Sequence, residues 1–265
     1  MSKWRLIVDG KCQASFNMAA DKYLFEYAVK DSSVPVLRIY GWNEPSITIG
    51  NHQSIERALD RFRLGGTPVV KRITGGRALL HETDEITYAV AGDFLKYRQL
   101  GNSLNESYNL ISSAIVQFYK FLGWAAEINR RDNPVSLSNS ATLQKGCMAA
   151  VSHYEILVNG QKMAAGSQRR ATHSFLQHGA IKLFPPQSHP AIRGGMEDVG
   201  LKEVEGIKQG RDDLIAGLVK KFEDEFSIEF EKHHWDLGER KYITEIESDF
   251  GNLNPAQIDL NKQVS

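Results

Sequence analysis

The sequence predicts an α+β fold in which a mixed, largely antiparallel sheet is flanked by helices. Short apolar segments recur along the chain, and tight turns separate most of them, which favours strands that pair with their sequence neighbours. The dipeptide Asn159-Gly160 lies between two such segments and is a strong signal for a two-residue hairpin turn. Other segments place apolar residues at helical spacing, as residues 108–122 do.

Turn and cap signals give the elements in chain order. We expect strands at residues 4–8, 34–40, 46–49, 69–73, 85–90, 154–158, directly after Gly160, 175–183 and 228–230. We expect helices at residues 16–30, from Ser54 to Gly65-Gly66, 108–122, 212–226 and 241–250. Ser15 and Ser54 are the predicted N-caps of the first two helices, and Asp9-Gly10 is predicted to end the first strand. The hairpin at Asn159-Gly160 and the strand after it predict a three-stranded meander.

The composition argues against several classes of function. Lys+Arg and Asp+Glu both total 32, so the chain has no overall basic charge with which to bind nucleic acid. No apolar segment approaches the roughly 20 residues of a membrane span, and the first residues, MSKWRLIVDGKCQ, lack the core of a signal peptide. We therefore expect a cytoplasmic protein without membrane contacts. Cys12 and Cys147 lie far apart and the histidines show no metal-ligand spacing, so we expect neither a disulfide nor a metal site.

Residues 68–88 contain the first candidate site. Gly75 and Gly76 form an expected sharp loop, and Arg72 and Arg77 flank them. Consecutive glycines allow backbone N–H groups to approach a carboxylate, a phosphate or an oxyanion closely. The alternative is an ordinary Gly-Gly turn with incidental arginines. The sequence has neither the GKS or GKT ending of a P-loop nor a GxGxxG fingerprint here.

The hairpin around Asn159-Gly160 contains the second candidate site. On the strand after the turn, a period of two places Lys162 on one face with small residues, which leaves room for an extended ligand. Such a lysine is a candidate to bind a carbonyl or a phosphate, and the alternative is a solvated lysine on an edge strand. Cys147, in a polar segment before the hairpin, and the polar triplet Gln177-His178-Gly179, within an apolar strand, favour the first interpretation.

These motifs resemble the superfamily of lipoate–protein ligase A, the octanoyltransferases and biotin–protein ligase. The similarity runs over nearly the whole chain and includes SFNMAAD at 15–21, LRIYGW at 37–42, KRITGGRALLH at 71–81, EITY at 85–88 and LQHGAI at 176–181. The family signature is R-x-x-G-G with a nearby histidine, followed by the lysine of the acyl site. In this sequence the signature falls on Arg72, Gly75, Gly76, His81 and Lys162. The resemblance implies a biotin/lipoate protein ligase-like catalytic domain.

Within the superfamily, the chain is most similar to the single-domain, cysteine-dependent octanoyltransferases. The resemblance implies that Cys147 is the nucleophile that forms an acyl-enzyme and that Lys162 is also catalytic. It implies substrate binding by Arg72, Gly75, Gly76, Arg77, His81, Gln177, His178 and Gly179. The implied donor is octanoyl acyl carrier protein. The implied acceptor is a lysine of a lipoyl domain, as in the glycine cleavage H protein or the E2 subunit of a 2-oxoacid dehydrogenase, and no cofactor is needed.

The resemblance also implies one catalytic domain over residues 1–265. Residues 186–265 are too short for the accessory domain of the ligases and are expected to form the helical C-terminal part of the same domain. Two alternatives stay open: an ATP-dependent lipoate–protein ligase that needs ATP and magnesium, alone or as the catalytic subunit of a split ligase, and a non-catalytic carrier-binding homologue. Cys147 argues against both. The family usually reads K-x-x-G-S-A after the hairpin, and here Ala165 takes the glycine position, which bears on acyl chain length.

Overall fold

The computed structural model describes residues 2–28, 30, 33–129, 155–194 and 207–254. Within these ranges, eight strands form one large sheet in the order β11-β1-β2-β6-β10-β9-β8-β7, and three form a small sheet in the order β4-β3-β5. The strands of the large sheet are β1 (Ser2–Cys12), β2 (Val36–Trp42), β6 (Ile86–Asp93), β7 (Ala126–Ile128), β8 (Ile156–Val158), β9 (Gln161–Ala171), β10 (Ser174–Ile181) and β11 (Ile228–His233). Those of the small sheet are β3 (Ser46–Ile49), β4 (Val69–Lys71) and β5 (Leu79–His81).

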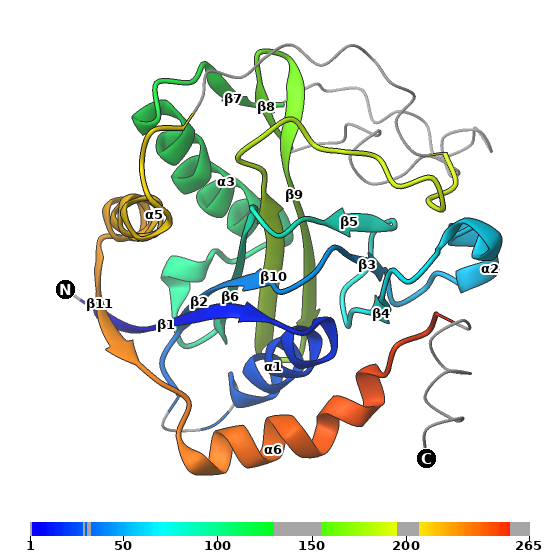
Figure 1. Cartoon of the computed structure of the whole chain (residues 1–265). Helices are drawn as coiled ribbons and strands as arrows, with labels where there is room; N and C mark the ends of the chain where they lie inside the picture. The colour runs from blue at the N-terminus through cyan, green and yellow to red at the C-terminus, as the bar shows by residue number, and fades with distance from the viewer. Residues whose placement is uncertain (1, 29, 31–32, 130–154, 195–206, 255–265) are drawn as a thin grey trace.

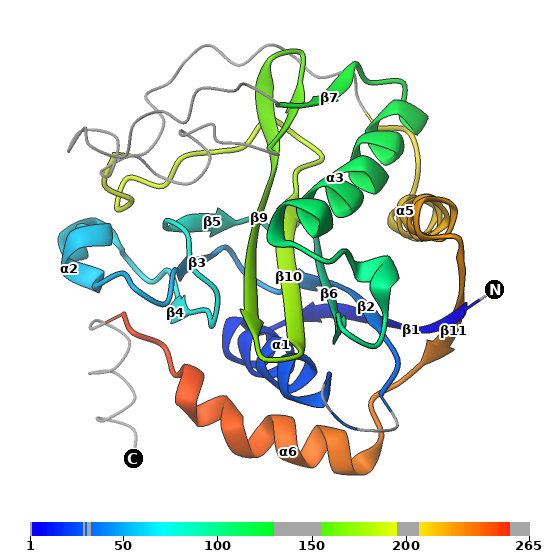
Figure 2. The same ribbon diagram turned by 180° about the vertical axis from the view of Figure 1, so that it is seen from behind.

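Helices cover both faces of the large sheet (Figure 1). They are α1 (Ala14–Tyr27), α2 (Ile55–Ala58), α3 (Leu104–Phe121), α5 (Arg211–Phe226) and α6 (Leu237–Glu247), and short 3₁₀ turns occupy Arg61–Arg63, Arg98–Leu100 and Ser248–Phe250. Helices α3 and α5 lie on one face and α1 and α6 on the other, while the small sheet and α2 lie to one side (Figures 1 and 2). Each face has its own apolar core, because Phe118 and Phe222 pack in one cluster and Leu24 and Ile243 in another.

The strand pairing confirms the predicted α+β class. Strand β1 runs parallel to both β11 and β2, and β3 runs parallel to β4. The pairs β2·β6, β6·β10, β10·β9, β9·β8, β8·β7 and β3·β5 are antiparallel. The sheet is therefore mixed and largely antiparallel. None of the helices in the described ranges is long and apolar enough to cross a membrane.

The meander β8-β9-β10 is the most exact of the sequence predictions. Asn159 and Gly160 both have positive φ angles, of 51° and 78°, as a two-residue hairpin turn of type I′ requires. Strand β9 lies between β8 and β10, so it is an interior strand of the sheet rather than an edge. The register pairs His178 with Ser167 and Gly179 with Gly166. This register fixes which side chains lie together at the site described below.

Two expected element boundaries near the N-terminus are wrong. Strand β1 does not end at Asp9-Gly10 but continues to Cys12, because a register shift in its pairing with β2, between Val8 and Lys11, accommodates one extra residue. Ser15 does not cap α1: the N-cap is Gln13, and Ser15 Oγ donates to Glu247 Oε1 at 2.6 Å, which ties α1 to α6. Here a tertiary contact outweighs the local capping preference.

The helix expected from Ser54 to Gly65-Gly66 is also wrong in length. It ends at Ala58, because buried Leu59 takes an extended backbone and forms an isolated bridge with Ile192. Strands β5 and β7 have three residues each and are too short to give a periodic signal. Helix α6 begins four residues before the expected residue 241, since Asp236 and Glu239 form a capping box that the sequence reading overlooked.

Candidate active site

Two cavities meet at strand β9. The larger one has a volume of about 420 Å³ and lies between α3 and the β8-β9-β10 meander; its lining residues are Tyr88, Leu104, Asn105, Tyr108, Ser112, Ile115, Glu155, Ile156, Ala164, Ala165, Gly166 and Gln177. The smaller one, of about 40 Å³, lies between the two sheets and is lined by Met18, Tyr40, Thr48, Arg72, Gly76, Leu79, His81, Thr87, Ala165, Gly166, Ser167, His178 and Gly179. Ala165 and Gly166 border both, so the two cavities are neighbours across one strand.

The alternation of β10 divides the predicted triplet between the two cavities. Gln177 faces α3, where its Nε2 donates to Tyr88 Oη at 3.2 Å beside the large cavity. His178 faces α1 and borders the small cavity. Gly179 permits close strand packing, since a Cβ there would lie 2.3 Å from the Ala165 carbonyl oxygen. The three residues therefore have three different roles rather than one shared role.

Lys162 lies at the buried start of β9. The residue is only 4% exposed, and its ammonium group forms an ion pair with Glu155, which lines the large cavity. The alternative interpretation, a solvated lysine on an edge strand, is therefore wrong. A buried lysine is costly unless it is paired, and a carboxylate at a cavity wall provides such a partner.

Arg72 holds the Gly-Gly loop from inside. Its guanidinium donates to the carbonyl oxygens of Gly75 at 2.8 and 3.1 Å and of Arg77 at 2.8 Å, and to the hydroxyl of Thr48 at 2.9 Å. Gly76 has a φ angle of 93°, and a Cβ there would lie 2.7 Å from the Arg72 guanidinium. The second glycine is thus required by both backbone conformation and space. The arginine positions the loop beside the small cavity.

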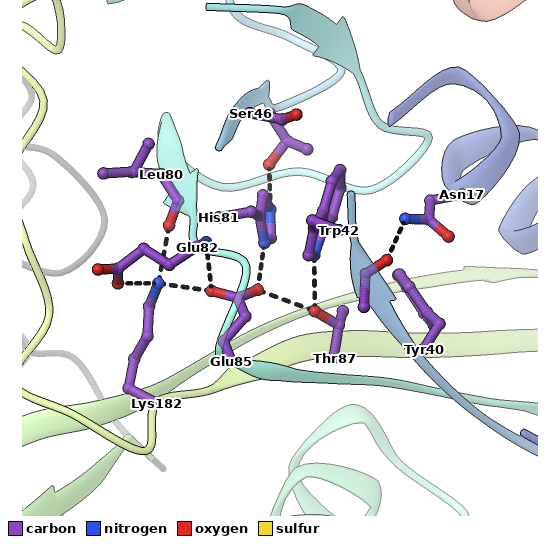
Figure 3. A network of polar contacts seen from close by, with 12 residues as sticks. Asn17, Tyr40, Trp42, Ser46, Leu80, His81, Glu82, Glu85, Thr87 and Lys182 are labelled. Atoms are coloured by element: carbon purple, nitrogen blue, oxygen red, sulfur yellow. Dashed lines mark hydrogen bonds and ion pairs between the residues drawn. The ribbon is translucent and has the colours of Figure 1, made fainter. Parts of the chain in front are cut away.

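His81 belongs to a buried polar network between the two sheets (Figure 3). Its Nδ1 lies 2.6 Å from Glu85 Oε1 and its Nε2 lies 3.0 Å from Thr48 Oγ1. The ring stacks on Trp42, with centroids 4.0 Å apart. Lys182 Nζ donates to Glu85 and, at 2.7 Å, to Glu82 Oε2. We call this set, completed by Arg72, the His81 network.

The pKa values fix the charges of the His81 network. Burial lowers the pKa of His81, and the positive charges of Lys182 and Arg72 add to this, although Glu85 opposes them. Burial alone would raise the pKa of Glu85, but Lys182 and His81 outweigh it and bring the value to about 2. The pair is therefore a neutral imidazole that donates from Nδ1 to an ionised carboxylate.

His178 belongs to a second buried network on the α1 face. Its Nδ1 lies 2.6 Å from Asp21 Oδ2, and its Nε2 lies 2.6 Å from Thr74 Oγ1. Thr74 Oγ1 in turn lies 2.7 Å from Ser167 Oγ, on β9. Arg38 NH1 donates to Asp21 Oδ1 at 2.9 Å. We call this set the His178 network.

Asp21 carries the negative charge of the His178 network. Burial alone would raise its pKa, but the hydrogen bond and charge of His178 and the charge of Arg38 outweigh burial and lower it. Tyr40 Oη also donates to Asp21 Oδ2, at 2.8 Å. The carboxylate is thus ionised, and both of its oxygens accept hydrogen bonds.

Several residues of these networks were missed by sequence reasoning. They are Asp21, Arg38, Glu85 and Lys182, each 2% exposed or less. A signal was present for Arg38 and Lys182, because each is a charged residue inside an otherwise apolar segment, VLRIY and AIKLF. Glu85 follows Glu82 and Asp84, and Asp21 precedes Lys22, so these two carboxylates lie in charged segments that give no such signal. Charged side chains are almost never fully buried unless they are paired, so such positions indicate a buried polar network.

Of the two cysteines, Cys12 lies within the described residues. Cys147 lies outside the described residues. Cys12, at the end of β1, is partly exposed, and burial raises the pKa of its thiol, so it is a poor nucleophile. Among the residues that the structure describes, no group of three or more His, Cys, Asp or Glu side chains is arranged to hold a metal ion.

Comparisons with known proteins agree on one family. The lipoyl protein ligase A/B catalytic domain matches residues 13–189. The chain is 36% identical over 185 residues to Octanoyltransferase LipM of Anoxybacillus flavithermus, a match that covers 68% of this chain and 65%, just under two thirds, of that protein. It is 36% identical over 268 residues to Octanoyltransferase LipM of Carboxydothermus hydrogenoformans, covering 93% and 95% of the two chains. Protein Ta0514 of T. acidophilum, solved with bound lipoic acid, has the same fold, with a TM-score of 0.71 at 18% identity over 94% and 96% of the chains.

Proposed function

The chain belongs to the lipoyl protein ligase A/B catalytic domain family, and we propose that it is an octanoyltransferase of lipoate assembly. It moves an octanoyl group from a carrier to a lysine of a lipoyl domain through an acyl-enzyme on Cys147. One observation in the site carries the proposal: a cavity of about 420 Å³ ends at the carboxylate of Glu155, which is paired with buried Lys162. That volume lies in the range of small-molecule pockets, about 300–1,000 Å³.

The first step is thioester exchange. The thiolate of Cys147 attacks the octanoyl carbonyl, a new carbon–sulfur bond forms, and the bond to the carrier's sulfur breaks. The proton given up by Cys147 goes to the departing carrier thiolate. Lys162 donates to the carbonyl oxygen while negative charge develops on it, and the amides of Gly75 and Gly76 are further donors. The octanoyl chain occupies the large cavity.

The second step is aminolysis. The lysine of the lipoyl domain enters as an ammonium ion and gives one proton to a base. Its amine then attacks the acyl carbonyl, a carbon–nitrogen bond forms, and the bond to Cys147 breaks. The second proton of the amine returns to the Cys147 thiolate. No nucleotide is consumed, because a thioester is already activated for acyl transfer.

The geometry supports the remaining binding roles in this proposal. Arg72 acts through the loop that it holds, and Gly76, His81 and His178 border the small cavity. Gln177 acts through Tyr88 at the large cavity. Arg77 flanks the loop with its carbonyl bound by Arg72. These contacts support positioning of the reacting carbonyl where the two cavities meet.

We further propose one domain over residues 1–265. Leu218 of α5 and Ile243 of α6 belong to the same two apolar clusters as the strands of the large sheet, which supports residues 186–265 as part of that domain. The donor is acyl carrier protein, and the acceptors are lipoyl domains such as those of the glycine cleavage H protein or a 2-oxoacid dehydrogenase E2 subunit. The protein works in the cytoplasm without a cofactor.

The test compares two donor mixtures by the intact mass of a lipoyl domain. We expect octanoylation with octanoyl acyl carrier protein in the absence of ATP, and no modification with free lipoate, ATP and magnesium. Cys147→Ala should abolish the first reaction. Modification from lipoate and ATP that does not depend on Cys147 would instead support a ligase, and a ligase that works only after a second protein is added would support a split one. No modification under any condition would support a non-catalytic carrier-binding homologue.

A further inference from the structure

The His178 network runs as an unbroken chain of short hydrogen bonds from a buried carboxylate to a cavity wall. Asp21, His178 and Thr74 are 4% exposed or less, whereas Ser167 is partly exposed and borders the small cavity. The three links measure 2.6, 2.6 and 2.7 Å. These four residues come from α1, β10, the segment after β4, and β9, so the fold brings the chain of hydrogen bonds together from four separate parts of the sequence.

Hydrogen-bonding capacity fixes the direction of each link. The Asp21 carboxylate can only accept, so His178 Nδ1 carries a hydrogen and donates to it. In a neutral ring Nε2 then accepts, so Thr74 donates to Nε2 and Ser167 donates to Thr74. Ser167 Oγ is left as an acceptor toward the small cavity. Once the ring gains a proton, every hydroxyl in the chain can reverse.

Such a chain moves a proton without moving heavy atoms. A donor in the cavity gives a proton to Ser167 Oγ, Ser167 passes its own proton to Thr74, and Thr74 passes its own to His178 Nε2. The product is an imidazolium ion beside the ionised carboxylate of Asp21. The arrangement of carboxylate, imidazole and hydroxyl is the one by which enzymes orient and stabilise a general base.

The size of the small cavity limits what reaches Ser167. A cavity of about 10–15 Å³ is enough to hold one water molecule. The small cavity, at about 40 Å³, therefore has room for the end of one side chain. It shares Ala165 and Gly166 with the large cavity, so a group at Ser167 lies beside the point where the acyl chain would end.

We propose that Ser167, Thr74 and His178 form a proton relay that accepts the proton of the incoming lysine ammonium ion during aminolysis. The inference rests on the proposed octanoyl transfer and names the base of its second step. In this reading Ser167 contacts the substrate, while Thr74 and His178 act through it. Asp21 keeps the imidazole in the required tautomer.

The test separates the two steps of the reaction. Thr74→Val keeps the shape of the side chain and breaks the relay. We expect octanoyl transfer from carrier to Cys147 to keep its rate, as measured by intact mass, and transfer from the acyl-enzyme to the lipoyl domain to fall about a hundredfold or more. Thr74→Ser, which restores the hydroxyl, should recover most of that loss. The solvent deuterium isotope effect on the second step should fall in Thr74→Val.

A matched control lies outside both cavities. Thr67 Oγ1 bonds His189 Nε2 at 3.1 Å, a threonine–histidine contact of the same kind, and Thr67→Val should leave both steps unchanged. The relay is wrong if Thr74→Val transfers at the wild-type rate, if both steps fall together, or if Thr74→Ser is as slow as Thr74→Val. Failure of the wild-type protein to form any acyl-enzyme would instead overturn the proposed function itself.

Discussion

The two buried histidines have the same kinds of hydrogen-bond partner, but the threonines that they contact lead to different groups. His81 has a carboxylate at Nδ1 and a threonine hydroxyl at Nε2, and so does His178. Thr48, however, also accepts from the Arg72 guanidinium, which holds its protons at any ordinary pH and cannot relay one. Thr74 instead meets the hydroxyl of Ser167. We therefore call the His81 network closed, because it ends at a guanidinium, and the His178 network open, because it ends at a hydroxyl beside the small cavity.

The closed network has a mechanical role. It joins Thr48 and His81 of the small sheet to Glu85 and Lys182, which adjoin strands β6 and β10 of the large sheet. Figure 3 shows the links from His81 through Glu85 to Lys182. Arg72 extends it to the Gly-Gly loop. Thr48, Arg72 and His81 also border the small cavity, so the network links the two sheets beside that cavity.

The largest expected effect comes from opening the closed network. Lys182→Met leaves the Glu85 carboxylate buried without its ammonium partner, and breaking a buried pair on one side costs about 3–5 kcal/mol. Urea unfolding should register that loss. Lys220→Met removes an exposed pair with Asp224 and should leave the unfolding free energy nearly unchanged, because solvent screens such a pair. Equal effects would mean that the buried pair does not join the sheets.

Exchanging the two threonines sharpens the comparison. Thr48→Val takes the hydroxyl partner from His81 Nε2 and one of two acceptors from Arg72 NH1, so the unfolding free energy should drop by about 1–3 kcal/mol. Because no proton passes through Thr48, the aminolysis step should slow far less than in Thr74→Val. The two measurements are urea unfolding and single-turnover transfer. A larger kinetic effect from Thr48→Val would reverse the assignment of the open and closed networks.

Acid should weaken the closed network in two stages. The pKa of His81 is lowered in the folded protein, so its unfolded form binds the extra proton first and stability falls as the pH drops through about 6.5. The pKa of Glu85 is about 2 when folded and 4.5 when free, so its contribution is present above 4.5 and is lost between 4.5 and about 2. The difference in unfolding free energy between wild type and Glu85→Gln should shrink across that lower window. A constant difference would contradict the ionised state of Glu85.

Much of this architecture was predictable from sequence, and the reason lies in local signals. Asn159 and Gly160 tolerate the positive φ angles that the hairpin turn requires, so the dipeptide alone predicts the turn. The strands on either side were predicted from their own residue pattern. The networks were not predictable as sets, because Asp21 and His178 are 157 positions apart, and Glu85 and Lys182 are 97 apart. The sequence can indicate that a charged residue is buried, but only the structure shows which residue it pairs with.

The smallest expected effect concerns acyl chain length. Ala165 borders both cavities, but its methyl group packs with Leu79 and Ala180 on the small-sheet side, so Ala165→Gly should leave the chain-length preference unchanged. Ala164 belongs to the core on the α3 side and lines the large cavity, so Ala164→Val should favour shorter donors. Each methylene excluded costs about 0.8 kcal/mol, or about fourfold in selectivity. Competition among acyl carrier proteins of different chain length measures both, and a shift from Ala165→Gly would place the chain on the other face of β9.

The acyl-enzyme tests the central claim most directly. The protein is mixed with octanoyl acyl carrier protein without acceptor or nucleotide, and its intact mass and acylated peptide are determined. The account predicts one octanoyl group, on Cys147, that disappears in Cys147→Ala, persists in Cys12→Ala, and leaves the enzyme when a lipoyl domain is added. An octanoylated lipoyl domain formed at the wild-type rate by Cys147→Ala would contradict it.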